Sequence, residues 1–124
     1  IHGSGEQTRC MIYIDDLVEA CFRVVNLGIK CETLNLTSDE EKSVLEIAEG
    51  IVEVTGIKSV GFKFVDDRPG QMMKEQIDIS KAKKILSWNP RITLRDGLKK
   101  TVSWLQNELD NSSRNRSDAR YQPT

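Results

Sequence analysis

The 124-residue sequence lacks most of the residues that mark a metal centre, a membrane protein or a nucleic-acid-binding domain. It has one histidine, and its three cysteines form no C-x-x-C pair, so the usual zinc-ligand spacings are absent. No apolar run approaches the ~20 residues of a membrane span, and we expect no secretory signal. The formal net charge of −1 gives no reason to expect a nucleic-acid partner.

Cysteine is scarce and odd in number. Cys10, Cys21 and Cys31 favour reduced thiols over a disulfide framework, and we therefore expect a cytoplasmic location. A hydrophobic content of 38% and a charged content of 30% are typical of a soluble globular domain. The first residue is not methionine, so we expect the chain to be cut from something longer, or processed.

Familiar nucleotide-binding and catalytic motifs are missing as well. The stretch from Gly3 to Thr8 matches only the first half of the dinucleotide fingerprint G-x-G-x-x-G, and a predicted strand follows it where a helix is needed. There is no P-loop, and neither tyrosine begins a Tyr-x-x-x-Lys pair. We expect the single His2 to be a solvated side chain. The sequence therefore predicts no catalytic residue and no metal ligand.

What is present is an alternation of strand and helix signals that predicts an α/β fold, with a small sheet of about three strands packed with about four helices. The strands are expected at 8–14, 32–38 and 60–64. The helix starts are expected at Asp15 or Asp16, at the capping box Ser43–Glu46, at Ser80 and at Thr93. Gly56 is expected to end the second helix.

Apolar residues at helical spacing mark the faces that we expect to be buried. In the first helix these are Leu17, Val18, Cys21, Val24 and Val25, and in the last helix Leu94, Leu98, Val102, Leu105 and Leu109. Trp88 and Trp104 are expected to fill the packing between the last two helices. From Asp110 the composition is almost wholly polar, so residues 110–124 are predicted to be a flexible tail beyond a domain of residues 1–109.

Two arginines have a setting that suits phosphate. Arg9 starts a mostly apolar strand just after a glycine turn, and Arg68 lies in the loop D-D-R-P-G-Q. A guanidinium is planar, stays charged and can donate two hydrogen bonds at once to phosphate oxygens. Two of them converging from two loops would neutralise a diphosphate. The alternative is a surface ion pair of Arg68 with Asp66 or Glu75, and spacing alone leaves both possibilities open.

Three segments, in this order, resemble one enzyme family. They are G-S-G-E-Q-T-R-C-M-I-Y-I-D-D-L-V-E-A at 3–20, L-N-L-T-S-D-E-E-K-S-V-L-E-I-A-E-G-I at 34–51, and the stretch 66–105 with its R-P-G loop and D-I-S-K-A helix. They are similar to parts of the extended short-chain dehydrogenase/reductase family, the NAD-dependent nucleotide-sugar epimerases and dehydratases. The resemblance covers residues 2–109.

This resemblance implies that the chain is the C-terminal substrate-binding portion of an extended Rossmann-type enzyme. NAD and the catalytic Tyr-x-x-x-Lys would then lie outside this chain, and no cofactor is expected on it. Arg9 and Arg68 would hold the diphosphate of a nucleoside diphosphate sugar. Asn35, Asp67, Gly70 and Gln71 would be further substrate-binding residues. We expect a homodimer, because a partial sheet leaves an edge that can pair.

Some positions depart from the family pattern. Cys10 and Ser87 stand where many members have aspartate and glycine, and Glu75 stands where many place an aromatic or basic residue near the base. Base, sugar and reaction outcome therefore stay open among epimerisation, dehydration and decarboxylation. Two alternatives also remain: a stand-alone non-catalytic binding or interaction module, and a fragment whose sheet is completed by a second copy. We expect the isolated chain to be inactive.

Overall fold

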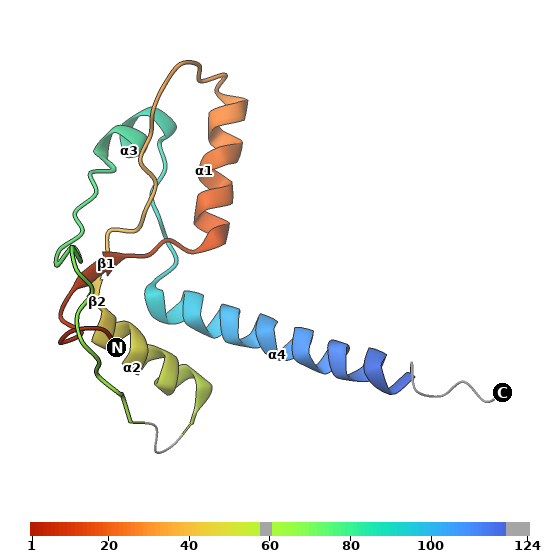
Figure 1. Ribbon diagram of the computed structural model, residues 1–124. Helices are drawn as coiled ribbons and strands as arrows, with labels where there is room; N and C mark the ends of the chain where they lie inside the picture. The colour runs from red at the N-terminus through yellow and green to blue at the C-terminus, as the bar shows by residue number, and fades with distance from the viewer. Residues whose placement is uncertain (58–60, 119–124) are drawn as a thin grey trace.

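The computed structural model describes residues 1–57 and 61–118, the side chains of 113–118 excepted. The elements in chain order are β1 (Thr8–Cys10), α1 (Ile14–Asn26), β2 (Glu41–Ser43), α2 (Val44–Thr55), α3 (Ser80–Leu86) and α4 (Leu94–Asp118). β1 and β2 pair antiparallel, with Arg9 opposite Lys42. Figure 1 shows α1 and α3 together at one end, the sheet and α2 at the other, and α4 extending away from them. The predicted α/β class is confirmed.

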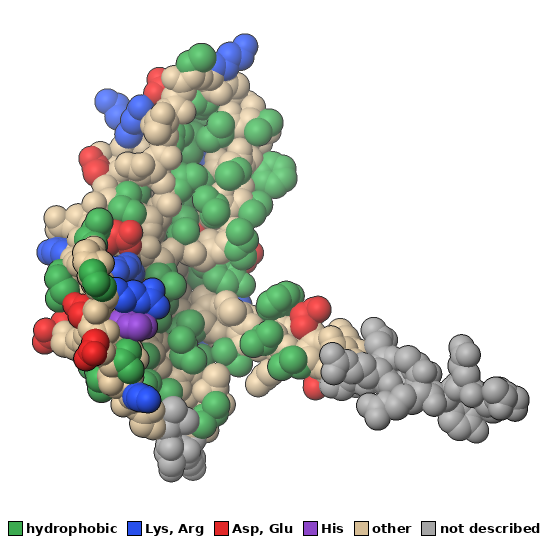
Figure 2. Space-filling model, viewed as in Figure 1, with side chains coloured by type: hydrophobic (Ala, Val, Ile, Leu, Met, Phe, Trp, Pro, Cys, Tyr) green, Lys and Arg blue, Asp and Glu red, His purple; other side chains and the backbone are tan. Residues whose placement is uncertain are grey.

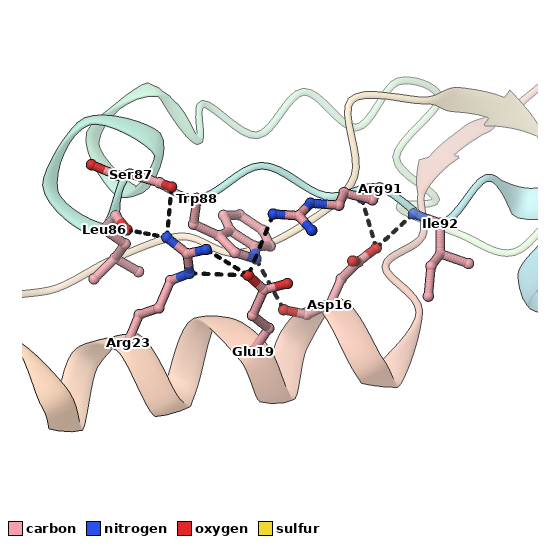
Figure 3. Close-up of polar contacts among 8 residues, drawn as sticks. All are labelled: Asp16, Glu19, Arg23, Leu86, Ser87, Trp88, Arg91 and Ile92. Carbon is pink, nitrogen blue, oxygen red and sulfur yellow. Dashed lines mark hydrogen bonds and ion pairs between the residues drawn. The ribbon is translucent and has the colours of Figure 1, made fainter.

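A small core around Trp88 joins α1 to α3. The buried apolar side chains are Ala20, Ile79, Ala82, Leu86 and Trp88. The Trp88 indole N–H donates to the backbone carbonyl of Asp16 at 3.1 Å. The buried Asp16 carboxylate accepts the backbone N–H groups of Arg91 and Ile92 at 3.0 and 2.9 Å (Figure 3). This end of the molecule is therefore held by side chains that lie out of water.

The predicted caps of α2 and α4 are confirmed. α3 begins at Ser80 as predicted, but the caps predicted for α1 and α3 are wrong. Ser43 and Glu46 form the expected capping box, and the Thr93 hydroxyl accepts the N–H of Asp96 at 3.2 Å. α1 begins at Ile14 without a side-chain cap, because the Asp16 carboxylate is used across the turn at 91–92. At α3 the N–H of Ser80 donates to the Asp78 carboxylate at 2.8 Å, so Ser80 is not the cap.

The predicted strands are mostly wrong. β1 ends at Cys10, and in the described chain residues 32–38 and 61–64 belong to no strand. Val60 of the third expected strand lies outside the described residues. β2, by contrast, was not predicted, since its Glu41, Lys42 and Ser43 show no apolar alternation. A strand needs a paired neighbour, and alternation within one segment does not say where that neighbour is.

The outer face of α1 is apolar and exposed, and α4 also carries exposed apolar side chains. Phe22 and Val25 are 64% and 76% exposed, and Ile14 and Val18 of the same helix are exposed as well. Figure 2 shows hydrophobic side chains gathered over α1. Burial of Val18, Cys21 and Val25 was predicted and is wrong. The prediction that both tryptophans fill the packing between the last two helices is wrong: Trp104 is 61% exposed, and Trp88 is buried in the core that joins α1 to α3. The other exposed members of the predicted α4 face are Leu105 and Leu109.

α4 is longer than the sequence pattern indicates. It continues to Asp118, so residues 110–118 are helical where a flexible tail is expected. Residues 119–124 of that tail lie outside the described residues. The half-buried Leu94, Leu98 and Val102 face the rest of the molecule as predicted, and α4 packs mainly on α2.

Candidate functional site

The glycine turn at the start of the chain packs against the loop that carries Arg68. Gly3 has a φ of +67°, and a side-chain carbon there would stand 3.1 Å from Cγ of Asp67. The Gly3 N–H donates to the carbonyl of Val65 at 3.0 Å, and the Val65 N–H donates to the carbonyl of Ile1 at 2.8 Å. Glycine is needed here both for the positive φ and for the close approach. The turn therefore seats a loop.

Arg68 is held by groups on both sides of it. Its backbone N–H donates to the Asp67 carboxylate at 2.8 Å, and its Nη2 lies 3.1 Å from Nε2 of His2. The other ring nitrogen of His2, Nδ1, lies 3.1 Å from the carbonyl of Asp66. The prediction of a solvated His2 is wrong, since the ring is half-buried and both nitrogens have protein partners. In the described part of the chain, Arg68 forms no ion pair with Asp66 or Glu75.

The turn after Arg68 has the geometry that its sequence indicates. The Gln71 N–H donates to the carbonyl of Arg68 at 3.1 Å, and Gly70 has a φ of +75°. Proline at the second position and glycine at the third are the residues that a type II turn favours. Asp67, Arg68, Gly70 and Gln71 therefore lie together in one exposed loop.

Arg9 contacts the far end of that same loop. Its Nη1 donates to the carbonyls of Thr8 and Met72 at 2.6 and 3.0 Å. The Thr8 N–H also donates to the carbonyl of Met73 at 2.8 Å, so β1 is joined to the loop by its backbone. No hydrogen bond within residues 1–57 and 61–118 uses Nε or Nη2 of Arg9, and these donors remain for another partner.

Two other predicted contacts lie apart from the arginines. The Asn35 amide donates to the carbonyl of Asp78 at 3.3 Å, beyond the loop. The Glu75 carboxylate accepts the N–H of Cys10 at 3.3 Å, and the Glu75 carbonyl lies 3.6 Å from the Cys10 thiol. Burial, together with the carboxylates of Glu41 and Glu75, raises the pKa of Cys10, so this thiol is a poor nucleophile.

The main hollows lined by described residues do not bring the two arginines together. One of about 530 Å³ lies between α2 and α4, and its charged lining is mostly acidic: Glu40, Glu46, Glu49 and Glu53 with Lys42 and Arg95. A diphosphate would be repelled there. Among the described residues, no group of histidine, cysteine or carboxylate side chains is arranged to hold a metal ion. No helix in the described ranges has the length and apolarity to cross a membrane.

Sequence reasoning missed His2 as a partner of Arg68. The two residues are 66 positions apart, and nothing near His2 in the sequence indicates the contact. Its place directly before the glycine turn is the single available signal. The sequence also did not indicate that the Met72 carbonyl would hold Arg9.

Comparisons with known proteins identify the family of the chain. Residues 1–101 match the family model described as GDP-mannose 4,6 dehydratase. The dTDP-glucose 4,6-dehydratase of Escherichia coli is 31% identical over 121 residues, which cover 89% of this chain and 33% of that enzyme. UDP-glucuronic acid decarboxylase 1 of Danio rerio is 33% identical over 115 residues, 93% of this chain and 27% of that protein.

A solved structure gives the same result. The UDP-glucuronic acid 4-epimerase of Bacillus cereus, a Y149F mutant in complex with UDP-4-deoxy-4-fluoro-glucuronic acid and NAD, superposes with a TM-score of 0.72 at 34% identity. The match covers 80% of this chain and 32% of that structure. The chain thus spans about a third of the length of the relatives it matches.

The residues present do not fit NAD. The Gly3–Gly5 turn leads into strand β1, whereas a dinucleotide fingerprint leads into the N-terminus of a helix. The sequence also contains no Tyr-x-x-x-Lys pair. These absences agree with a chain that covers only part of its relatives. The chain belongs to the GDP-mannose 4,6 dehydratase family, among the NAD-dependent nucleotide-sugar dehydratases and epimerases of the extended short-chain dehydrogenase/reductase type.

Proposed function

We propose that this chain is the C-terminal, substrate-anchoring part of such an enzyme and that Arg9 and Arg68 bind the diphosphate of a nucleoside diphosphate sugar. One observation carries the proposal: both arginines, far apart in sequence, contact one exposed loop, Arg68 within it and Arg9 through the Met72 carbonyl. The Bacillus cereus relative is crystallised with a UDP-sugar. Two guanidinium groups on one loop suit the charge and the oxygen geometry of a diphosphate.

The other predicted residues have supporting roles in this proposal. Asp67 fixes the backbone of Arg68, and the turn at Gly70 brings Gln71 back beside it. Exposed backbone N–H groups of such a turn can approach a ligand without a side chain in the way. Asn35, held by the carbonyl of Asp78, would contact the substrate from the other side of the loop.

Anchoring is the whole contribution that we assign to the chain. Binding energy gained at the diphosphate, away from the reacting carbon, orients the sugar for chemistry performed elsewhere. We assign no proton transfer to Cys10, whose pKa is raised, or to His2, whose ring is engaged with Arg68. We therefore expect the isolated chain to turn over no sugar nucleotide, and measured epimerase, dehydratase or decarboxylase activity would contradict this.

We further propose that the exposed apolar face of α1 is covered by the part of the enzyme that this chain does not span. The face carries Ile14, Val18, Phe22 and Val25, and a patch of this kind marks an interaction surface. A homodimer is the competing way to cover it. Sedimentation of the chain at rising concentration separates the two: a monomer supports the proposal, and a dimer that Phe22→Glu dissociates would contradict it.

A cytoplasmic location is part of the proposal. It is supported by the three cysteines, Cys10, Cys21 and Cys31, which are all free thiols. Mass spectrometry of the protein isolated from its native cells would show three reduced thiols, whereas a disulfide or a glycan would count against this location.

The direct test is calorimetric titration of the chain with UDP-glucose, dTDP-glucose and GDP-mannose. Arg9→Ala and Arg68→Ala should each weaken binding by about 1.5–3 kcal/mol, the scale of a charge-assisted hydrogen bond. Arg91→Ala is the matched control, since that side chain is 69% exposed and lies on α1's side of the molecule near Glu19. A double arginine variant that binds as tightly as the parent, or a parent that binds none of the three ligands, would remove the assignment.

A further inference from the structure

Both the backbone and the ring of His2 are held by contacts with other residues. Its carbonyl accepts the side-chain N–H of the buried Gln7 at 2.8 Å, and its backbone forms an isolated bridge with Val65. Its ring is fixed by the Asp66 carbonyl on one side and reaches the Arg68 guanidinium on the other. Backbone and ring together place one nitrogen against the charged end of Arg68.

The protonation state of the ring follows from its two neighbours. A guanidinium can only donate, so Nε2 must accept from Arg68, and Nδ1 then carries the proton that points to the Asp66 carbonyl. A protonated ring would have no acceptor and would place a second positive charge 3.1 Å from Arg68. The contact therefore exists only with a neutral imidazole.

The remaining charges around the ring are few. The Asp67 carboxylate lies beside Gly3 and accepts the N–H of Arg68, and Asp66 faces the ring with its carbonyl. Arg68 is thus the charged group in direct contact with the ring.

We propose that His2 is a positioning residue, whose neutral ring holds the Arg68 guanidinium in place for the substrate diphosphate. The inference rests on the proposed function of Arg68. It predicts that loss of the ring weakens nucleotide-sugar binding only while Arg68 is present. Direct contact of the ring with the diphosphate would instead make that loss independent of Arg68.

Calorimetric titration with UDP-glucose measures the contribution of the His2 ring to binding. His2→Phe should weaken binding at pH 8 about three- to tenfold, the loss of one hydrogen bond. His2→Gln, which can still accept from Arg68, should restore most of the affinity.

The double variant separates positioning from direct contact. In the Arg68→Ala background, His2→Phe should have no further effect, because the interaction energy of the pair is already lost. A further loss in that background would overturn the proposal in favour of direct contact with the diphosphate. If Arg68→Ala weakens binding and His2→Phe does not, the positioning role alone is wrong. If neither has an effect, the proposed function fails as well.

The histidine ring also provides a spectroscopic check. Because it is the single histidine of the sequence, its long-range ¹H–¹⁵N signals need no assignment. The free protein at pH 8 should show the tautomer protonated at Nδ1, and Arg68→Ala should shift the ring towards a mixture. An Nε2-protonated ring in the parent would contradict the contact.

Discussion

The two ends of the molecule are held together by different means. At the Trp88 end, α1 and α3 enclose a dry core, and Arg23 of α1 donates to the carbonyls of Leu86 and Ser87 at 3.0 and 2.7 Å, where α3 ends (Figure 3). At the arginine end, the loop from Asp66 to Met73 is largely exposed and is joined to β1 and the glycine turn mainly by backbone hydrogen bonds.

This difference predicts that the Trp88 end determines the stability of the fold and that the arginine end determines binding. Opening a packed core creates cavities and orphans buried polar groups, whereas an exposed loop can move at little cost and admit a ligand. Substitutions at the Trp88 end should therefore change the free energy of unfolding, and substitutions at the arginine end should change affinity with smaller effects on stability.

The largest effect is expected for Trp88→Ala. The side chain is fully buried and donates to the Asp16 carbonyl, so its loss should lower the free energy of unfolding by about 3–5 kcal/mol. Denaturant titration followed by circular dichroism measures this. Trp104→Ala, at a 61% exposed side chain, is the control and should change stability by about 0.5 kcal/mol or less. Equal losses in the two variants would mean that the core does not lie where the structure places it.

Asp16→Ala should come next. It leaves the N–H groups of Arg91 and Ile92 without their acceptor, in a site that is shielded from water, at a cost of about 2–3 kcal/mol. The neighbouring Asp15→Ala removes an exposed pair with Lys100 and should cost about 0–1 kcal/mol. The same denaturant titration compares them. If Asp15→Ala proved the more damaging variant, the carboxylate that joins α1 to the turn at 91–92 would be misidentified.

Gly3→Ala tests the arginine end with a smaller effect on stability. A positive φ costs a non-glycine residue about 1–2 kcal/mol, and Gly28→Ala carries the same strain, since φ there is +62°. Only at Gly3 would the new carbon press on Asp67, because nothing lies within 4 Å of the corresponding carbon at Gly28. We expect similar unfolding energies in the two variants but weaker UDP-glucose binding in Gly3→Ala alone. Equal affinities would show that the glycine turn does not seat the Arg68 loop.

How far the sequence could predict each end depends on the distance over which its interactions act. The capping box Ser43–Glu46 and the Thr93–Asp96 start need residues three positions apart, and both were predicted. Burial of Trp88 was predicted, but its contact with α1 was not, because Asp16 of α1 lies 72 residues away in the sequence. The α/β class followed from the same local periodicities.

What could not be predicted is long-range. Residues 32–38 show the apolar alternation of a strand, but a strand also needs a paired neighbour, and the sequence of the segment does not indicate one. The exposed face of α1 has the periodicity of a buried face, and that pattern does not say which surface covers it. The contact of His2 with Arg68 could not be predicted for the same reason, since the two residues are 66 positions apart in the sequence.

The smallest effect that we expect is a loss of hydrogen-exchange protection at low pH, and it depends on Glu46 at the start of α2. Hydrogen bonds from the backbone and side chain of Ser43 lower the pKa of Glu46 below its ordinary range, with help from Lys42. The folded state thus favours the charged carboxylate, whose contribution is complete above the ordinary glutamate pKa and is lost as pH falls through the lowered value.

The start of α2 holds the glycine turn, because the N–H groups of Val44 and Leu45 donate to the carbonyls of Gln7 and Gly5 at 2.9 and 3.0 Å. Acid should therefore loosen the arginine end first. Amide hydrogen exchange at falling pH, corrected for intrinsic rates, should show protection lost at Val44 and Leu45 before Ala20 and Ala82, and Glu46→Gln should flatten this early loss. Simultaneous loss at both ends would mean that the two regions unfold as one cooperative unit, and the separation of folding from binding would not hold.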